Sequence, residues 1–148
     1  MKKFSKILAF VLVVCMAVCM MACSTYGKVE KAFINEGYTV CGTENNSTAE
    51  SMEKDCEDND IAVKVHLLRK DFHFVMIFEF NATDDMIEFY KESNTAQGIM
   101  KDIEEDGSAK EFYNMLVEKG YANGNCLVLP VLALGNTFDN ILNIVKNA

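Results

Sequence analysis

The sequence has few of the residues and motifs from which most active sites are built. Only two of its 148 residues are histidine, and its eight glycines are scattered. They form neither the G-x-G-x-x-G loop of dinucleotide sites nor the turn that carries a catalytic serine. A cysteine nucleophile needs a nearby base, and Cys41, Cys56 and Cys126 have no local signature of such a pair. We therefore expect a protein that is not an enzyme.

Positive charge is also scarce. The chain has 14 Lys and Arg residues against 22 Asp and Glu residues. Residues 1–22 hold three of the lysines and no acid, so the rest of the chain has 11 basic and 22 acidic side chains, a charge of −11. Such a chain repels nucleic-acid phosphates and anionic lipid headgroups. We expect no nucleic-acid partner and no membrane attachment through basic residues.

The chain has one proline and no long Gly/Ser-rich linker, so nothing divides it into several domains. Half of its residues are apolar, with ten Phe and five Tyr, which argues against disorder. Residues 24–148 suit one domain of common size. We expect a single α+β domain over residues 29–148.

Three cysteines remain after Cys23, and this odd number allows at most one disulfide within the chain. An exported protein can form one. The candidate pairs are Cys41 with Cys126 and Cys41 with Cys56. The alternative is that all three are free and buried as small apolar residues.

The most informative segment is the N-terminal one. Lys2, Lys3 and Lys6 precede an uncharged run over residues 7–22, which ends in Ala22 and is followed by Cys23. A charged start, an apolar middle and a small residue at the end are typical of an export signal. An uncut transmembrane helix over residues 7–22 would span about 24 Å, which is short of the ~30 Å hydrocarbon core.

The VCMMAC sequence of residues 18–23 resembles the lipobox of bacterial lipoproteins, with Met20 where that family usually has Leu. The resemblance implies that residues 1–22 are a signal peptide, that cleavage falls between Ala22 and Cys23, and that a lipid is joined covalently to the Cys23 sulfur. Residues 23–28 would form a short tether on the extracytoplasmic face of the cell membrane. An ordinary secretory signal, with Cys23 incidental, is the alternative.

The clearest structural pattern is a hairpin over residues 61–80. Its two halves alternate between apolar and polar residues, and a turn at Lys70-Asp71 would pair Val65 with Met76 and Val63 with Phe78. Apolar residues at helical spacing flank this hairpin, and residues 126–134 indicate a further strand. We expect an α+β fold in which helices pack on one face of a small antiparallel sheet.

The second face of the predicted hairpin is half polar, as expected for a sheet face in contact with water. His66 and His73 would lie diagonally across it, roughly 7–8 Å apart at Cα, but two histidines alone do not make a metal site. We expect no metal and no cofactor besides the lipid. This face is our candidate surface for an envelope protein partner, through Lys64, His66, His73 and Ile77. The alternative is a lipoprotein that binds a small ligand or a metal and serves a transporter.

Overall fold

The structure, a computed structural model, describes residues 25–41, 47–100, 103, 107–133 and 135–148. The expected signal peptide, Ala22 and Cys23 lie outside the described residues. The helices are α2 (Thr25–Asn35), α3 (Ser47–Glu57), α4 (Thr83–Glu92), α5 (Asn94–Ile99), α6 (Ala109–Lys119) and α7 (Asn136–Lys146). The strands are β1 (Thr39–Cys41), β2 (Val63–Lys70), β3 (His73–Phe80), β4 (Ala122–Asn123) and β5 (Cys126–Leu132).

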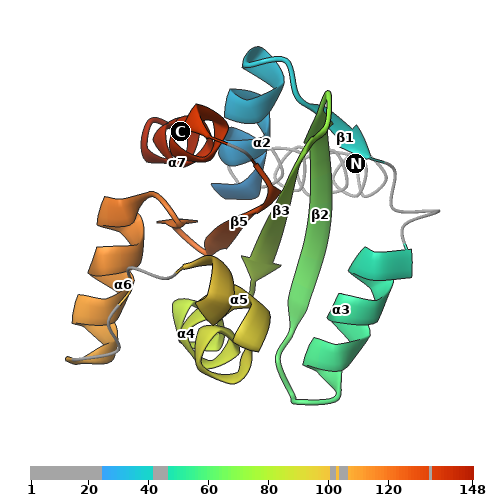
Figure 1. The fold of residues 1–148 in the computed structure, drawn as a ribbon. Helices are drawn as coiled ribbons and strands as arrows, with labels where there is room; N and C mark the ends of the chain where they lie inside the picture. The colour runs from blue at the N-terminus through green and yellow to red at the C-terminus, as the bar shows by residue number, and fades with distance from the viewer. Residues whose placement is uncertain (1–24, 42–46, 101–102, 104–106, 134) are drawn as a thin grey trace, which may run out of the picture.

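The five strands form one antiparallel sheet in the order β1-β2-β3-β5-β4 (Figure 1). The β2–β3 hairpin lies at its centre, and the helices flank it. The α+β class predicted from the sequence is confirmed. None of the described helices is long and apolar enough to cross a membrane.

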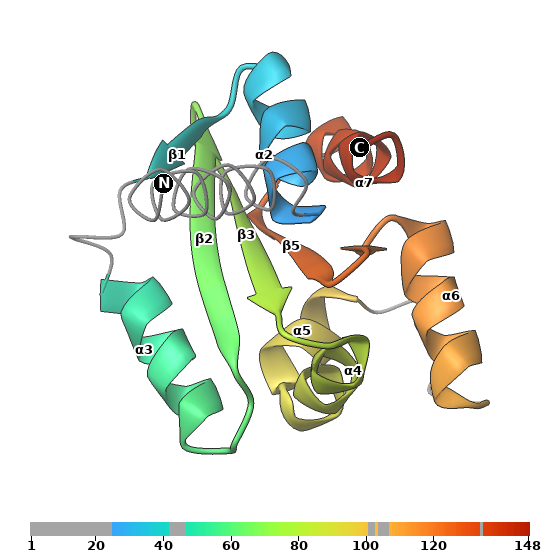
Figure 2. The same ribbon diagram turned by 180° about the vertical axis from the view of Figure 1, so that it is seen from behind.

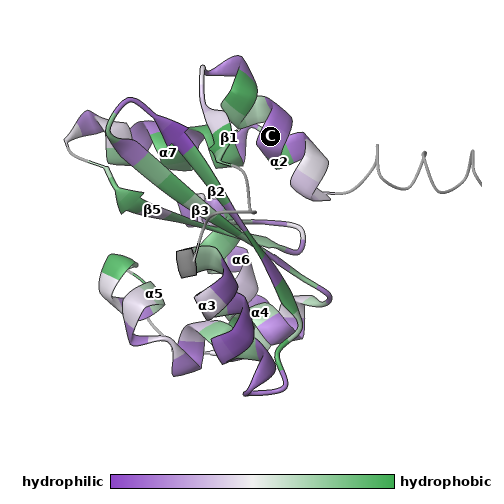
Figure 3. Ribbon diagram, turned by 90° about the vertical axis from the view of Figure 1, so that its right-hand side faces the viewer, coloured by the Kyte–Doolittle hydropathy of each residue, from purple (hydrophilic) through white to green (hydrophobic). Residues whose placement is uncertain are grey.

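Helices cover both faces of the sheet, whereas we expected them on one. Met76, Phe78 and Phe80 of β3 point into a core formed with α3, α4, α5 and α6. Val75 and Ile77, which alternate with them, point into a second core beneath α2 and α7. Figures 2 and 3 show the sheet between these two groups of helices. The reason is visible in β3, where residues 75–78 are all buried, as in a strand covered on both faces.

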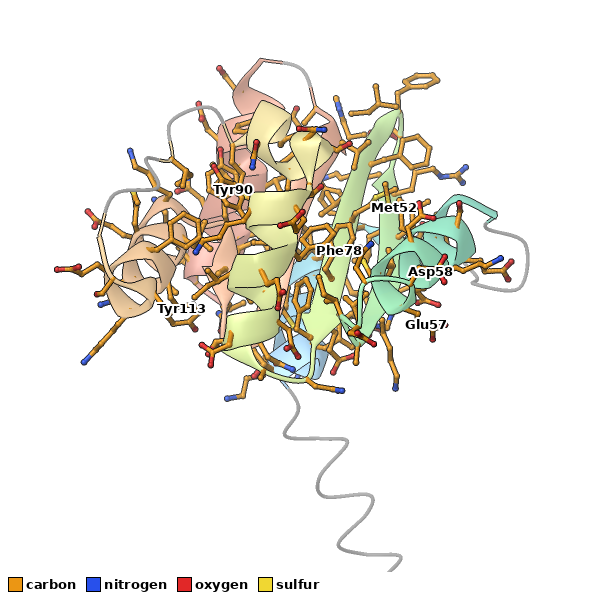
Figure 4. All side chains as sticks on the ribbon, turned by 90° about the horizontal axis from the view of Figure 1, so that it is seen from below. Met52, Glu57, Asp58, Phe78, Tyr90 and Tyr113 are labelled. Carbon is orange, nitrogen blue, oxygen red and sulfur yellow. The ribbon has the colours of Figure 1, made fainter. Side chains whose placement is uncertain are left out.

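The core on the α3–α6 face is rich in aromatic side chains. The Phe78 ring lies 4.8 Å from that of Phe89 in α4, measured between centroids. Figure 4 shows Phe78 between α4 and α3, while Glu57 and Asp58 point outward at the end of α3. Both acids are exposed, so this end of the acidic run over residues 55–60 lies in water.

The hairpin register differs from the predicted one by two residues. The turn lies at Asp71-Phe72, so Val65 is opposite Phe78 and Val63 is opposite Phe80. Asp71 adopts a positive φ of 53°, a conformation that Asp tolerates better than most residues. A shift of two residues leaves every side chain on its predicted face, because strand side chains alternate with a period of two.

The domain begins earlier than expected. Helix α2 starts at Thr25, within the segment 23–28 that we assigned to the tether. Val29 and Phe33, four residues apart, are its buried face and anchor it to the sheet. Gly124, in the β4–β5 turn, is packed against Thr25, since a Cβ at position 124 would lie 2.6 Å from the Thr25 methyl group. The N-terminal end of α2 is therefore fixed against that turn.

Candidate functional site

The hairpin face that we chose as an interaction surface is not an open surface. Ile77 is fully buried, and His66 and His73 are partly buried. The ring of Tyr26 in α2 stacks on the His66 ring, with centroids 3.7 Å apart and planes at 16°. Lys64 alone of the four chosen residues is exposed. Because α2 and α7 cover this face, it is mainly a second core.

The two histidines do not approach each other as predicted. His66 is opposite Ile77, and His73 is opposite Lys70, so they are separated by four residues along the hairpin. At about 3.4 Å per residue this is roughly 14 Å, too far for a shared metal ion. Over the described residues, no three His, Cys, Asp or Glu side chains are grouped in a way that could hold a metal.

A small polar cluster lies beneath the first turns of α2. The Nε2 atom of His66 is 3.3 Å from Oε2 of Glu79. Cys126 pairs with Glu79 in the sheet, and burial together with the nearby Glu79 carboxylate raises the pKa of the Cys126 thiol to about 12. Burial also raises the pKa of Tyr26, and its hydrogen bond to Glu30 raises it further. Cys126 and Tyr26 therefore stay protonated at neutral pH, so Cys126 is poorly suited to act as a nucleophile.

Within the described part of the chain no disulfide forms, and Cys41, Cys56 and Cys126 are free thiols. The pairing of Cys41 with Cys126 is excluded by the strand order, because β2 and β3 lie between their strands. Three strand spacings are about 14 Å, while a disulfide needs Cα atoms within roughly 7 Å. Cys56 and Cys126 are buried, as the free-thiol alternative predicted, and Cys41 is partly buried.

An open groove of about 720 Å³ lies between α2, α7 and the β2–β3 turn. Figures 1 and 2 show α2 and α7 side by side near that end of the hairpin. The lining of the groove is mostly polar, and the volume of the groove lies in the usual range of small-molecule sites. The residues that line it are Ala32, Asn35, Glu36, Tyr38, Lys70, Asp71, His73, Thr137, Asn140, Asn143, Ile144 and Asn147.

One stripe of α7 supplies much of this lining. Thr137, Asn140, Asn143 and Asn147 recur at three- and four-residue spacing, so they share one face of the helix. On a neighbouring face, Ile141 and Val145 are fully buried against the sheet. The burial of one face thus holds the amide side chains of the other along the groove.

The Lys70 side chain, which lines the groove, is engaged with the protein itself. Lys70 donates a hydrogen bond of 2.6 Å from Nζ to the Glu36 carbonyl oxygen, and its Nζ lies 5.6 Å from the centroid of the Tyr38 ring. Burial and the nearby Glu36 raise the pKa of Tyr38, which stays neutral. Glu36 and Asp71 are exposed. Lys70 therefore ties the hairpin to the end of α2.

Of the four residues chosen from the sequence for the hairpin face, His73 lines this groove, whereas the groove itself and its asparagines were not predicted. A signal was present, because residues 137–147 carry an uncharged polar stripe beside the apolar stripe that predicts the helix. Only the apolar stripe entered our prediction of this helix. Comparisons of this chain with protein-family models, curated proteins and solved structures find no match.

Proposed function

We propose that the chain is a lipid-anchored protein on the extracytoplasmic face of a bacterial cell membrane, where it acts as a non-catalytic binding module. The observation that carries this proposal is the sequence of residues 18–23, which resembles a lipobox ending in Ala22-Cys23. Two or three acyl chains on Cys23 would hold the protein stably, since each buried CH₂ contributes about 0.8 kcal/mol.

The placement of the groove fits such an anchor. Helix α2 begins two residues after Cys23, and its other end meets the hairpin through the bond from Lys70 to Glu36. Its 11 residues span about 16 Å. The lipid would thus lie at one end of α2 and the groove at the other, so that the groove faces away from the membrane.

The thiols support a binding role over a catalytic one. Burial raises the pKa of both Cys56 and Cys126, which keeps them protonated and weakly nucleophilic. The proposed partner is another protein of the cell envelope. Crosslinking of the anchored protein in cells, followed by identification of what is captured, tests for that partner.

Labelling cells with a radioactive fatty acid tests the anchor. We expect label on the wild-type protein and none on Cys23→Ser, because no other residue would carry the lipid. Cys19→Ser is the matched control and should keep its label. Label that persists on Cys23→Ser, or is missing from the wild type, would refute the anchor.

The second candidate, a small-ligand-binding lipoprotein that serves a transporter, is favoured by the volume of the groove. Metal binding, the other form of this candidate, would use His66 or His73. Metal analysis of the purified protein, with His66→Ala and His73→Ala as variants, tests that form separately from the groove.

A further inference from the structure

We propose that the groove between α2, α7 and the β2–β3 turn is a carbohydrate-binding site that takes an uncharged, polyhydroxylated chain. This inference deepens the proposed binding role and rests on it for access to envelope glycans. The binding chemistry itself belongs to the groove and does not require the lipid.

The amide stripe favours hydroxyl-rich ligands. Asn35, Asn140, Asn143 and Asn147 line the groove together with Thr137, and their side chains are exposed or partly exposed. An amide presents both donors and an acceptor, and a sugar hydroxyl is likewise both donor and acceptor. A row of such groups can pair with successive hydroxyls without placing a charge against any of them.

The charges of the lining argue against an anionic ligand. Lys70 is the one Lys or Arg residue among the described residues that line the groove, and it already donates to the Glu36 carbonyl. Glu36 and Asp71 add two negative charges at the rim. A phosphate or carboxylate would meet net repulsion there, whereas a neutral sugar would not.

An exposed aromatic residue, Phe72, lies next in sequence to two residues of the polar lining but is not part of that lining itself. Phe72 is 88 % exposed at the hairpin turn, between Asp71 and His73, which both line the groove. A ring so exposed contributes little to folding, and turns favour small polar residues at such positions. The apolar face of a sugar ring can pack on it and remove both from water. Insertion of Phe72 into the anchoring membrane is disfavoured because the turn lies at the end of α2 opposite to Cys23.

The groove is held by rigid elements. Ile141 and Val145 fix α7 to the sheet, Val29 and Phe33 fix α2, and Lys70 fixes the turn to the end of α2. A site that is already formed loses little entropy when it binds, and this suits the shallow, polar contacts that sugars make.

Titration calorimetry of the mature protein with chitotetraose and cellotetraose, both uncharged, tests the proposal, with tetragalacturonate as the anionic probe. We expect saturable binding of at least one neutral tetrasaccharide with a Kd of about 10 mM or tighter, and weaker binding of tetragalacturonate. Asn140→Ala, Asn143→Ala and Phe72→Ser should each weaken binding by about fivefold or more, as loss of one contact predicts.

Asn114→Ala is the matched control, because Asn114 is an exposed asparagine of α6 that does not line the groove. Circular dichroism checks that each variant folds. The proposal is overturned if neither neutral tetrasaccharide binds, if tetragalacturonate binds more tightly, or if the groove variants bind as well as Asn114→Ala does. If the fatty-acid label is missing from the wild type but sugar binding is intact, the lipid anchor is refuted and the carbohydrate site is not.

Discussion

At the scale of single residues, burial decides what the thiols can do. Cys126 is fully buried beside Glu79, and its raised pKa leaves almost no thiolate at neutral pH. Cys41 lies on the edge strand β1 and is partly exposed. The sequence shows these cysteines without their surroundings, so it could not rank their reactivity.

We predict that Cys41 is alkylated by iodoacetamide at pH 8 much faster than Cys126 in the folded protein. The reason is that Cys126 is both inaccessible and protonated, with a pKa of about 12. Mass spectrometry of the alkylated peptides gives the two rates, and denaturant should make them similar. Cys41→Ser should lose the fast phase, and a rate for Cys126 equal to that of Cys41 would contradict the prediction.

At the scale of elements, short sequence patterns that mark the two ends of a helix agree well with the structure. A capping box of Ser108 and Glu111, whose pattern can be recognised in the sequence, begins α6, with Ser108 Oγ accepting from the Glu111 amide. Gly120, a residue type that often ends helices, ends this one at a φ of 88°, and a Cβ there would lie 2.5 Å from the Leu142 carbonyl oxygen. Both signals depend on only a few neighbouring residues.

Ser108→Ala should lower the free energy of unfolding by about 1 kcal/mol, as is usual for a lost N-cap. The effect should depend on pH, because hydrogen bonds from the Ser108 backbone and side chain lower the pKa of Glu111. Such a carboxylate stabilises the fold above its unfolded pKa, and that contribution is lost as pH falls through its folded pKa.

Urea unfolding of the wild type and of Ser108→Ala at neutral and acid pH measures this difference. The gap between the two proteins should narrow at acid pH. Ser93→Ala, which removes the side-chain cap of α5 without a carboxylate partner, is the control and should show a gap that changes less with pH. A Ser108→Ala gap that is unchanged at acid pH would show that Glu111 contributes nothing.

The pairing of one strand with the next was harder to predict. The turn lies one residue later than predicted, with Asp71 at a positive φ, and the pairing of the two strands is shifted by two residues along the whole hairpin. Proline in a strand favours an edge position or an irregular pairing, and Pro130 in β5 has both. Strand β4 reaches only as far as Leu127, and a register irregularity lies between Phe74 and Val75, opposite Pro130.

At the scale of the whole molecule, the α+β class followed from the sequence but the number of layers did not. One face of the hairpin is half polar, and from the sequence we interpreted it as facing water. Its polar residues are Lys64, His66, His73 and Glu79. Helix α2 covers that face, and the ring of its Tyr26 packs on the His66 ring. This part of the polar face is therefore shielded from water. Residue types along a strand cannot reveal which distant helix covers it.

Ile77→Ala tests this second core. We expect it to lower the free energy of unfolding by about 2–5 kcal/mol, the usual cost of a cavity at a fully buried site. Lys64→Ala, on the same face but exposed, should change stability by less than about 0.5 kcal/mol. Equal, small effects in thermal unfolding would mean that the face is open in solution.

The two outer strands of the sheet are short, with three residues in β1 and two in β4. An unpaired strand edge is a template on which a second chain can add its own strand, and a brief edge offers few backbone groups for this. Proteins concentrated on a surface meet one another often. With the proposed lipid anchor, the short outer strands of this sheet would let many copies lie close together at a membrane without joining into fibres.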